Sequence, residues 1–289
     1  MSSSRPCGVA ARVIRAGLLL LPALVLAEPS PATPDRIVSL NLCTDSLLLE
    51  LAPPGASLSL TKLSRNPRLS PLAAEASRHA SNDGLAEQVV DFKPQLVLAA
   101  SDTSATTQLL RKLGYRVEIL APADTLADYR HALFHLATLL GSEQVATDLW
   151  RRLQQRLSTL PRPAKPEDAV LLSGNGYLPM KGSLSRELLA TVGLKDASAR
   201  YSTTAQGTVP LEALVRDPPT WLVAGIDTGG APALAGEYLG HPALQGVFAD
   251  SSRVIPLPEM HVTCAGAYFA DAAEALSQAL VRGEARMSP

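Results

Sequence analysis

The sequence lacks the motifs by which most enzymes are recognised from residue order. It contains no P-loop, nucleophile elbow or HExxH pair, and its 3 cysteines form no C-x-x-C motif. The segment GNGYLPMKG (174–182) matches a glycine-rich dinucleotide turn only in part, because Pro179 stands where the third glycine belongs. These absences leave an enzyme as a remote alternative.

Aromatic residues and net charge are also scarce. Phe, Trp and Tyr make up 4% of the chain, and 26 Lys and Arg are offset by 27 Asp and Glu. Because the basic residues are spread along the chain and balanced by acids, we expect no nucleic-acid partner.

A short apolar run, AGLLLLPALVLA (16–27), lies near the N-terminus behind Arg12 and Arg15. It is too short to span a bilayer, and Val25-x-Ala27 suits a signal-peptide cleavage site; a retained membrane anchor is the alternative. We therefore interpret residues 1–27 as a signal peptide and expect the mature protein in the periplasm. Cleavage would leave two cysteines in an oxidising compartment, which favours one disulfide.

Strand-like and helix-like segments alternate along the rest of the chain, as expected for an α/β fold. Strands are predicted at RIVSLN (36–41), LSLTKL (58–63), PQLVLAA (94–100), YRVEIL (115–120), AVLLSG (169–174), TWLVAG (220–225) and RVIPLP (253–258). Between Thr125 and Leu160 only helical periodicity occurs, with Gly141 as a candidate kink. The pattern predicts two α/β lobes, 28–125 and 163–289, joined by a helical segment at 126–162.

One unit of the sequence occurs twice. LAEQVVDFKPQLVLA (85–99) aligns without gaps on PLEALVRDPPTWLVA (210–224), so that Glu87 falls on Glu212 and Pro94 on Pro219. Each copy predicts a short helix that leads through a proline turn into a buried strand. The match has two explanations. Either any helix-to-strand unit would produce it, or the two lobes are related.

Taken in order, RIVSLN, GLAEQVVDFKPQLVLA, LRKLGYRVEIL, VPLEALVRDPPTWLV and VIPL resemble the periplasmic binding proteins of ABC importers for cobalamin, ferric siderophores and haem. The resemblance covers nearly all of 36–280. It implies two Rossmann-like lobes joined by one long bridging helix (class III), with a metal-organic ligand between them and no intrinsic cofactor. It also implies a carrier that is monomeric when free and docks on an ABC permease dimer with its ATPase subunits.

In that family, the Glu seven residues before the proline of each unit docks on arginines of the permease. The matching residues here are Glu87 and Glu212. Two exposed carboxylates, one per lobe, suit a permease with two-fold symmetry. The alternative is that both acids only favour the dipole of the helix they begin.

The loops after the strands would line the ligand cleft. The candidate ligand-binding residues in them are Asn41, Cys43, Thr44, Ser64, Arg65, Ser81, Asn82, Asn175, Tyr177, Tyr201, His261, Cys264 and Tyr268. Ser81 and His261 match the positions of cleft tryptophans in cobalamin binders, so the sequence departs from those binders there. Tyr177, Tyr268 or His261 could ligate a haem-like chelate, and Arg65 is the obvious basic residue for a ferric siderophore. A corrinoid, a ferric siderophore and a haem-like chelate all stay open as cargo.

Three interpretations of Cys43 and Cys264 stay open. As a disulfide they would lock the two lobes. As thiolates they would join His261 in a soft ligand set for a thiophilic metal or its small complex. They could also be two unrelated buried residues. A bare hard-metal site is not favoured, because His131 and His135 fall in the helical segment, away from the predicted cleft.

Overall fold

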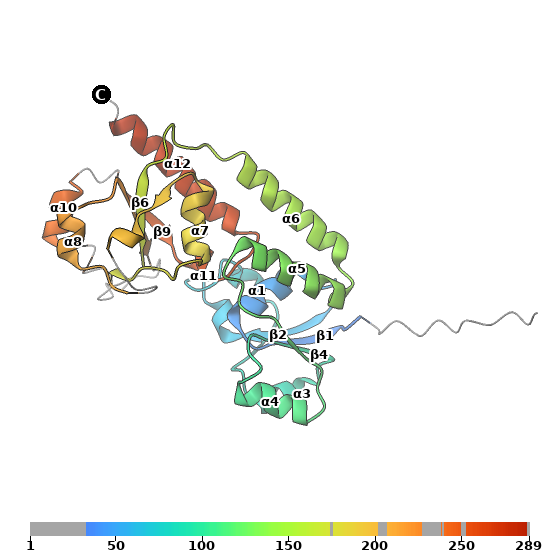
Figure 1. Ribbon diagram of the computed structural model, residues 1–289. Coiled ribbons are helices and arrows are strands. Elements are labelled where there is room, and N and C mark those ends of the chain that lie inside the picture. The colour runs from blue at the N-terminus through green and yellow to red at the C-terminus, as the bar shows by residue number, and fades with distance from the viewer. Residues whose placement is uncertain are drawn as a thin grey trace, which may run out of the picture. The chain divides into compact units, whose positions relative to one another are not determined.

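Two parallel β-sheets form the framework of the protein. The computed structural model describes residues 33–173, 176–201, 207–226, 238, 240–249 and 253–287 (Figure 1). The first sheet has the order β3-β2-β1-β4-β5, and the second has the order β7-β6-β8-β9. The strands of the first sheet are β1 (Arg36–Ser39), β2 (Ser57–Thr61), β3 (Ala80–Asn82), β4 (Leu96–Ala99) and β5 (Val117–Ile119). Those of the second are β6 (Asp168–Leu172), β7 (Lys195–Asp196), β8 (Trp221–Ile226) and β9 (Val254–Pro258).

The helices cover both faces of the first sheet because its buried strands are apolar on both sides. The helices are α1 (Leu42–Leu51), α2 (Ala73–Ala76), α3 (Ala86–Phe92), α4 (Ala105–Lys112), α5 (Leu126–Leu140), α6 (Glu143–Ser158), α7 (Leu184–Thr191), α8 (Leu211–Arg216), α10 (Pro242–Val247), α11 (Met260–Thr263) and α12 (Phe269–Met287), with 3-10 turns η1 (Lys62–Arg65) and η3 (Ser198–Arg200). Ile37 of β1 packs in the cluster with α1 and α5, whereas its neighbour Val38 packs in the cluster with α3 and α4. Figure 1 shows α3 and α4 on one side of the strands and α1 and α5 on the other.

The repeated sequence unit has the same structure in both halves. In the gap-free alignment, the first residues of α3 and β4, Ala86 and Leu96, fall on Leu211 and Trp221, which begin α8 and β8. β4 lies next to β1 in its sheet, and β8 lies next to β6 in the other. The prediction of a helix that leads into a buried strand is confirmed for both copies.

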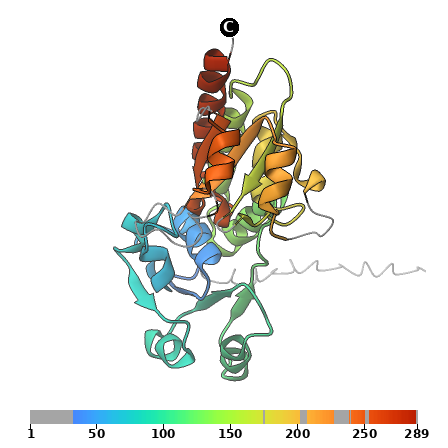
Figure 2. The ribbon, with the colours of Figure 1, turned by 90° about the vertical axis from the view of Figure 1, so that its left-hand side faces the viewer.

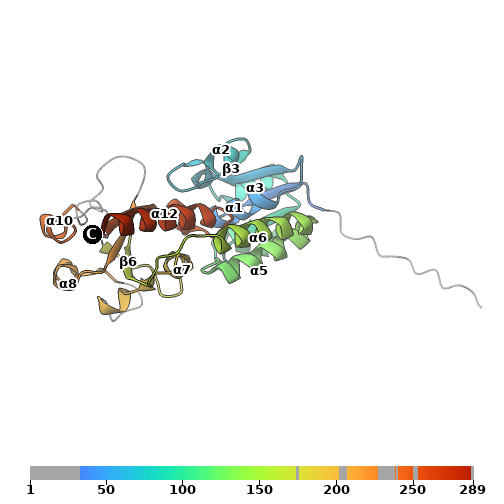
Figure 3. The same cartoon turned by 90° about the horizontal axis from the view of Figure 1, so that it is seen from above.

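The connection between the two sheets consists of two helices. A capping box of Thr125 and Asp128 begins α5, and Gly141 ends it with a φ of 63°. That left-handed backbone suits glycine, so Gly141 separates α5 from α6 rather than kinking one helix. α5 and α6 lie side by side, and α12 reaches α6 (Figure 3).

A single apolar cluster extends through both sheets. It contains Ile37 and Leu58 from the first sheet and Val223 and Ile255 from the second, together with residues of α5, α6 and α12. α12, red in Figure 2, packs along the second sheet against β9. On α6, Arg156 forms ion pairs with two acids of α12 at 2.6 and 2.7 Å. A continuous apolar core of this kind opposes relative movement of the two halves.

The predicted signal peptide, residues 1–27, lies outside the described residues. Among the helices that the structure describes, none has the length and apolar character needed to cross a membrane.

Candidate functional site

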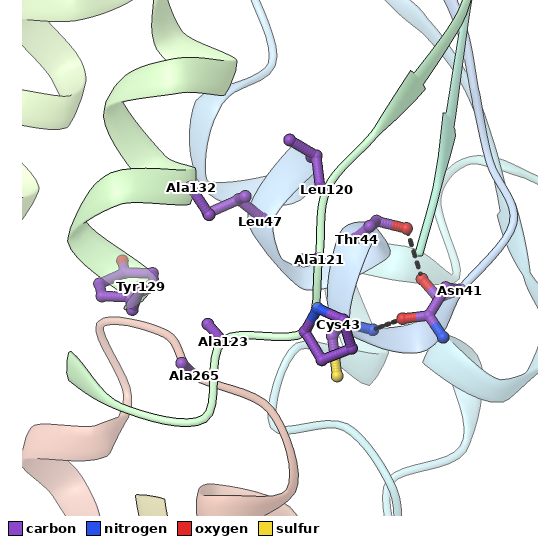
Figure 4. Close-up of a pocket in the computed structure, with 11 residues that line it drawn as sticks. Asn41, Cys43, Thr44, Leu47, Leu120, Ala121, Ala123, Tyr129, Ala132 and Ala265 are labelled. Carbon is purple, nitrogen blue, oxygen red and sulfur yellow. Dashed lines mark hydrogen bonds between the residues drawn. The ribbon is translucent and has the colours of Figure 1, made fainter. Parts of the chain in front are cut away.

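The turn between β1 and α1 is shaped by Asn41. Its side-chain oxygen accepts a hydrogen bond from the backbone N–H of Cys43 at 2.8 Å, and its carbonyl accepts one from the Thr44 hydroxyl at 2.9 Å (Figure 4). Asn is a favoured N-cap residue because its side chain satisfies an otherwise unpaired amide of the first turn. The turn therefore holds Cys43 at the start of α1, at the carboxyl edge of the first sheet.

Two predicted ligand contacts are buried in the loops of this edge. Asn82 donates to the carbonyl of Ser39 and to the hydroxyl of Ser59, both at 3.1 Å, and Ser64 donates to the carbonyl of Thr61 at 2.8 Å. Asn82 is 1% exposed and Ser64 is 0% exposed. In the structure the polar atoms of Asn82 and Ser64, both predicted as ligand contacts, hold neighbouring strand ends together.

Asp45 is a buried carboxylate that the sequence interpretation missed. It accepts hydrogen bonds from the backbone N–H of Thr61 at 3.1 and 3.2 Å and from the Thr61 hydroxyl at 2.5 Å. Burial raises the pKa of Asp45 to about 6, although these hydrogen bonds lower it in part. Asp45 thus ties α1 to the end of β2. Its sequence signal is weak, because an acid in the first turn of a helix is common.

Cys43 and Cys264 form a disulfide, with their Cα atoms 5.1 Å apart. It links the start of α1 to the segment that follows α11, across 221 residues of sequence. Because the two sulfurs are bonded to each other, neither is available as a thiolate ligand. Within the described ranges, no group of three or more His, Cys, Asp and Glu residues is arranged to hold a metal ion. The structure therefore contradicts the predicted metal set of Cys43, His261 and Cys264.

A second link between α1 and the same segment lies two helical turns further on, at Glu50. The Tyr129 hydroxyl donates to one carboxylate oxygen of Glu50 at 2.8 Å, and the backbone N–H of Ala267 donates to the other at 2.7 Å. Part of the Glu50 residue reaches solvent, but protein surrounds its carboxylate, and this burial raises its pKa to about 7. Glu50 thereby joins α1, α5 and the start of α12.

Tyr268 lies beside this link and is 6% exposed. Burial raises the pKa of its phenol above the ordinary value for tyrosine. Tyr268, predicted as a ligand contact, is therefore enclosed by protein in this structure.

A small cavity lies between the disulfide and Tyr129. Its volume is about 20 Å³, and it is lined by Asn41, Cys43, Thr44, Leu47, Leu120, Ala121, Pro122, Ala123, Tyr129, Ala132 and Ala265 (Figure 4). Since a cavity needs about 10–15 Å³ to hold a water molecule, this one has room for about one. The structure thus brings three predicted contacts together, but in a space too small for a metal chelate.

The other predicted contacts are scattered. Tyr201, predicted as a cleft residue, is 7% exposed, and its hydroxyl donates to the carbonyl of Asp217, near the amino end of β8. Tyr177 is 48% exposed. Ser81, Arg65 and His261 are half-buried: the Arg65 guanidinium donates to the carbonyl of His79, and burial lowers the pKa of His261. Asn175 lies outside the described residues.

Glu87 and Glu212 occupy equivalent places in the two repeated units. Each lies in the first turn of its helix, α3 or α8, and each is exposed. Neither carboxylate forms an ion pair with another described residue. Both carboxylates are therefore exposed in a way that lets them meet a cation on another protein.

A family model described as periplasmic binding protein matches residues 37–258. The chain belongs to the periplasmic binding protein family. The resemblance inferred from the sequence motifs is confirmed, and so is the two-lobed class III fold. Members of this family and the similar structures are binding proteins rather than enzymes. No curated protein sequence matches the chain.

Three solved structures share this fold at low sequence identity. The heme-binding protein RhuT from Roseiflexus sp. RS-1 is 18% identical, with a TM-score of 0.69 over 86% of this chain and 98% of that one. The vitamin B12-binding protein BtuF of Vibrio cholerae is 19% identical, with a TM-score of 0.62 over 87% and 98%. FhuD2 from Staphylococcus aureus is 14% identical, with a TM-score of 0.65 over 86% and 99%.

Proposed function

We propose that this protein is the periplasmic solute-binding component of an ABC importer and that its cargo is a metal-organic complex. Membership of the periplasmic binding protein family carries the proposal. The similar structures include a heme-binding protein and a vitamin B12-binding protein, which supports a large metal chelate as the cargo class. The signal peptide expected at residues 1–27 agrees with a periplasmic location.

Glu87 and Glu212 are the proposed contacts to the permease. They lie at the same place in two repeated units, one in each half of the protein, which suits a partner with two-fold symmetry. A role in favouring the helix dipole would require no such matched placement.

Replacing both glutamates by alanine should abolish most uptake through the cognate permease. A hydrogen bond to a charged group contributes about 1.5–3 kcal/mol, so the loss of two such contacts should weaken docking by about a hundredfold or more. The measurement is ATP-dependent cargo uptake into proteoliposomes. Glu143→Ala is the matched control, since Glu143 is another exposed first-turn acid, on α6. Unchanged uptake by Glu87→Ala with Glu212→Ala would disprove the docking role.

The cargo itself can be identified by native mass spectrometry of protein purified from the periplasm. We expect a bound mass with a metal isotope pattern that is lost on unfolding. The cavity beside the disulfide is too small for such a ligand, so the ligand should bind elsewhere. Loading the protein should therefore not require reduction of the disulfide. Protein that stays free of any metal-containing mass, even when isolated from cells supplied with haem, corrinoid and ferric siderophore, would contradict this cargo class.

A further inference from the structure

A larger cavity lies beside α5, outside the contact between α1 and the second half. Its volume is about 280 Å³, and its wall consists of the chain that follows β5, at 119–122, and of one face of α5. The α5 residues that line it are Asp128, His131, Ala132 and His135. The apolar wall and the polar helix face make it a pocket in which two imidazoles are the dominant functional groups.

The two histidines stand one helical turn apart, at positions i and i+4, and both are exposed. Such positions are neighbours on a helix surface. Their rings are nearly parallel, with an angle of 5° between the planes and 6.5 Å between the centroids. The nearby Arg130 directs its guanidinium over the rings of Phe134 and Trp150, at 5.5 and 5.9 Å, so its charge is engaged outside this pocket.

Glu118 of β5 orients one of the two imidazoles. Its carboxylate oxygen lies 2.9 Å from Nε2 of His135. When Nε2 carries the proton and donates it to Glu118, Nδ1 keeps the lone pair that a metal ion needs. A carboxylate behind a histidine in this way is the usual outer partner of a metal-binding imidazole. Asp128 is already engaged, because its carboxylate accepts hydrogen bonds from the hydroxyl and the N–H of Thr125.

We propose that His131 and His135 chelate a divalent transition-metal ion, with Glu118 as the outer partner of His135. In the described part of the chain no third His, Cys, Asp or Glu completes a metal-binding group, so water fills the remaining positions. Two nitrogen ligands plus water suit the tetragonal geometry of Cu²⁺, and Cu²⁺ binds more tightly than Ni²⁺ or Zn²⁺ to a given nitrogen site. The site is separate from the proposed cargo and does not depend on it.

The test is a titration with Cu²⁺, followed by calorimetry and by electron paramagnetic resonance. It uses the oxidised mature protein, whose two remaining cysteines are paired, so that no free thiol competes for the ion. We expect one Cu²⁺ per chain, with magnetic coupling to two nitrogen atoms. Glu118→Gln should weaken binding by about 10–100-fold, the usual effect of removing an outer partner, and His131→Gln or His135→Gln should weaken it at least as much.

His79→Gln is the matched control, since His79 lies on a different segment and faces Glu75 at 3.8 Å. It should leave the affinity and the two-nitrogen signal unchanged. Both pocket histidines are exposed, so their glutamine variants should fold, which circular dichroism can verify. Binding of wild-type strength in His131→Gln with His135→Gln, or a single-nitrogen signal in the wild type, would overturn the proposal.

Discussion

Removal of the Cys43–Cys264 disulfide should lower the free energy of unfolding by about 2–5 kcal/mol, the typical effect of losing a native disulfide. The bond closes a loop of 221 residues in sequence separation, and cross-links that close long loops restrict the unfolded chain most. It also joins two halves that a common apolar core already holds together, so the folded state should keep its structure without it. For a chain of this size, the melting temperature should fall by roughly 5–15 °C.

The measurement is thermal and urea unfolding of the wild type and of Cys43→Ser with Cys264→Ser, each with and without reductant. Reductant should destabilise the wild type and leave the double variant unchanged, which makes the double variant its own control for side effects of the reagent. Equal melting temperatures of the oxidised wild type and the double variant would show that the bond adds no stability. The second link, at Glu50, should persist in the double variant, because its hydrogen bonds to Tyr129 and Ala267 do not involve the cysteines.

Much of the fold could be predicted from the sequence because its central strands have a strong pattern. β4 and β8 are continuous apolar runs behind proline turns, which is typical of strands covered on both faces. The edge strands β3 (Ala80–Asn82) and β7 (Lys195–Asp196) were missed. They are only three and two residues long and carry polar side chains, so neither hydrophobic periodicity nor strand propensity predicts them.

The site could be predicted less completely. The two cysteines could be placed on facing loops only through the two-lobe fold that the family resemblance implies, and their pairing was one of three open interpretations. Ser64 and Asn82 have the polar character of ligand contacts, but they serve the loops themselves, and sequence alone does not distinguish these roles. Glu50 gave no signal, because its partners lie 79 and 217 residues away in sequence.

Glu50 should make the protein less stable as the pH rises from about 4.5 to above 7. Burial raises its pKa from 4.5 to about 7 in the folded protein, so the folded state binds more protons than the unfolded state between these values. Its contribution to stability is therefore fully present below pH 4.5 and is lost as the pH rises through 7. A difference of this size corresponds to at most about 3 kcal/mol at 1.36 kcal/mol per pKa unit.

The variant Glu50→Gln removes the titration and keeps a side chain that can accept a hydrogen bond from Tyr129 or Ala267. Unfolding free energies of the wild type and the variant should be compared at pH 4.5, 6, 7 and 8. As the pH rises across this range, the unfolding free energy of the wild type should fall by about 2–3 kcal/mol relative to that of the variant. Other titrating groups, including Asp45 and His261, are the same in both proteins and therefore cancel in the comparison. For Asp45→Asn, the difference in unfolding free energy from the wild type should change over a lower pH range, since burial raises the pKa of Asp45 only to about 6. A constant difference between the wild type and Glu50→Gln at all four pH values would mean that Glu50 keeps an ordinary pKa. The link between α1, α5 and α12 would then be held by an ionised carboxylate.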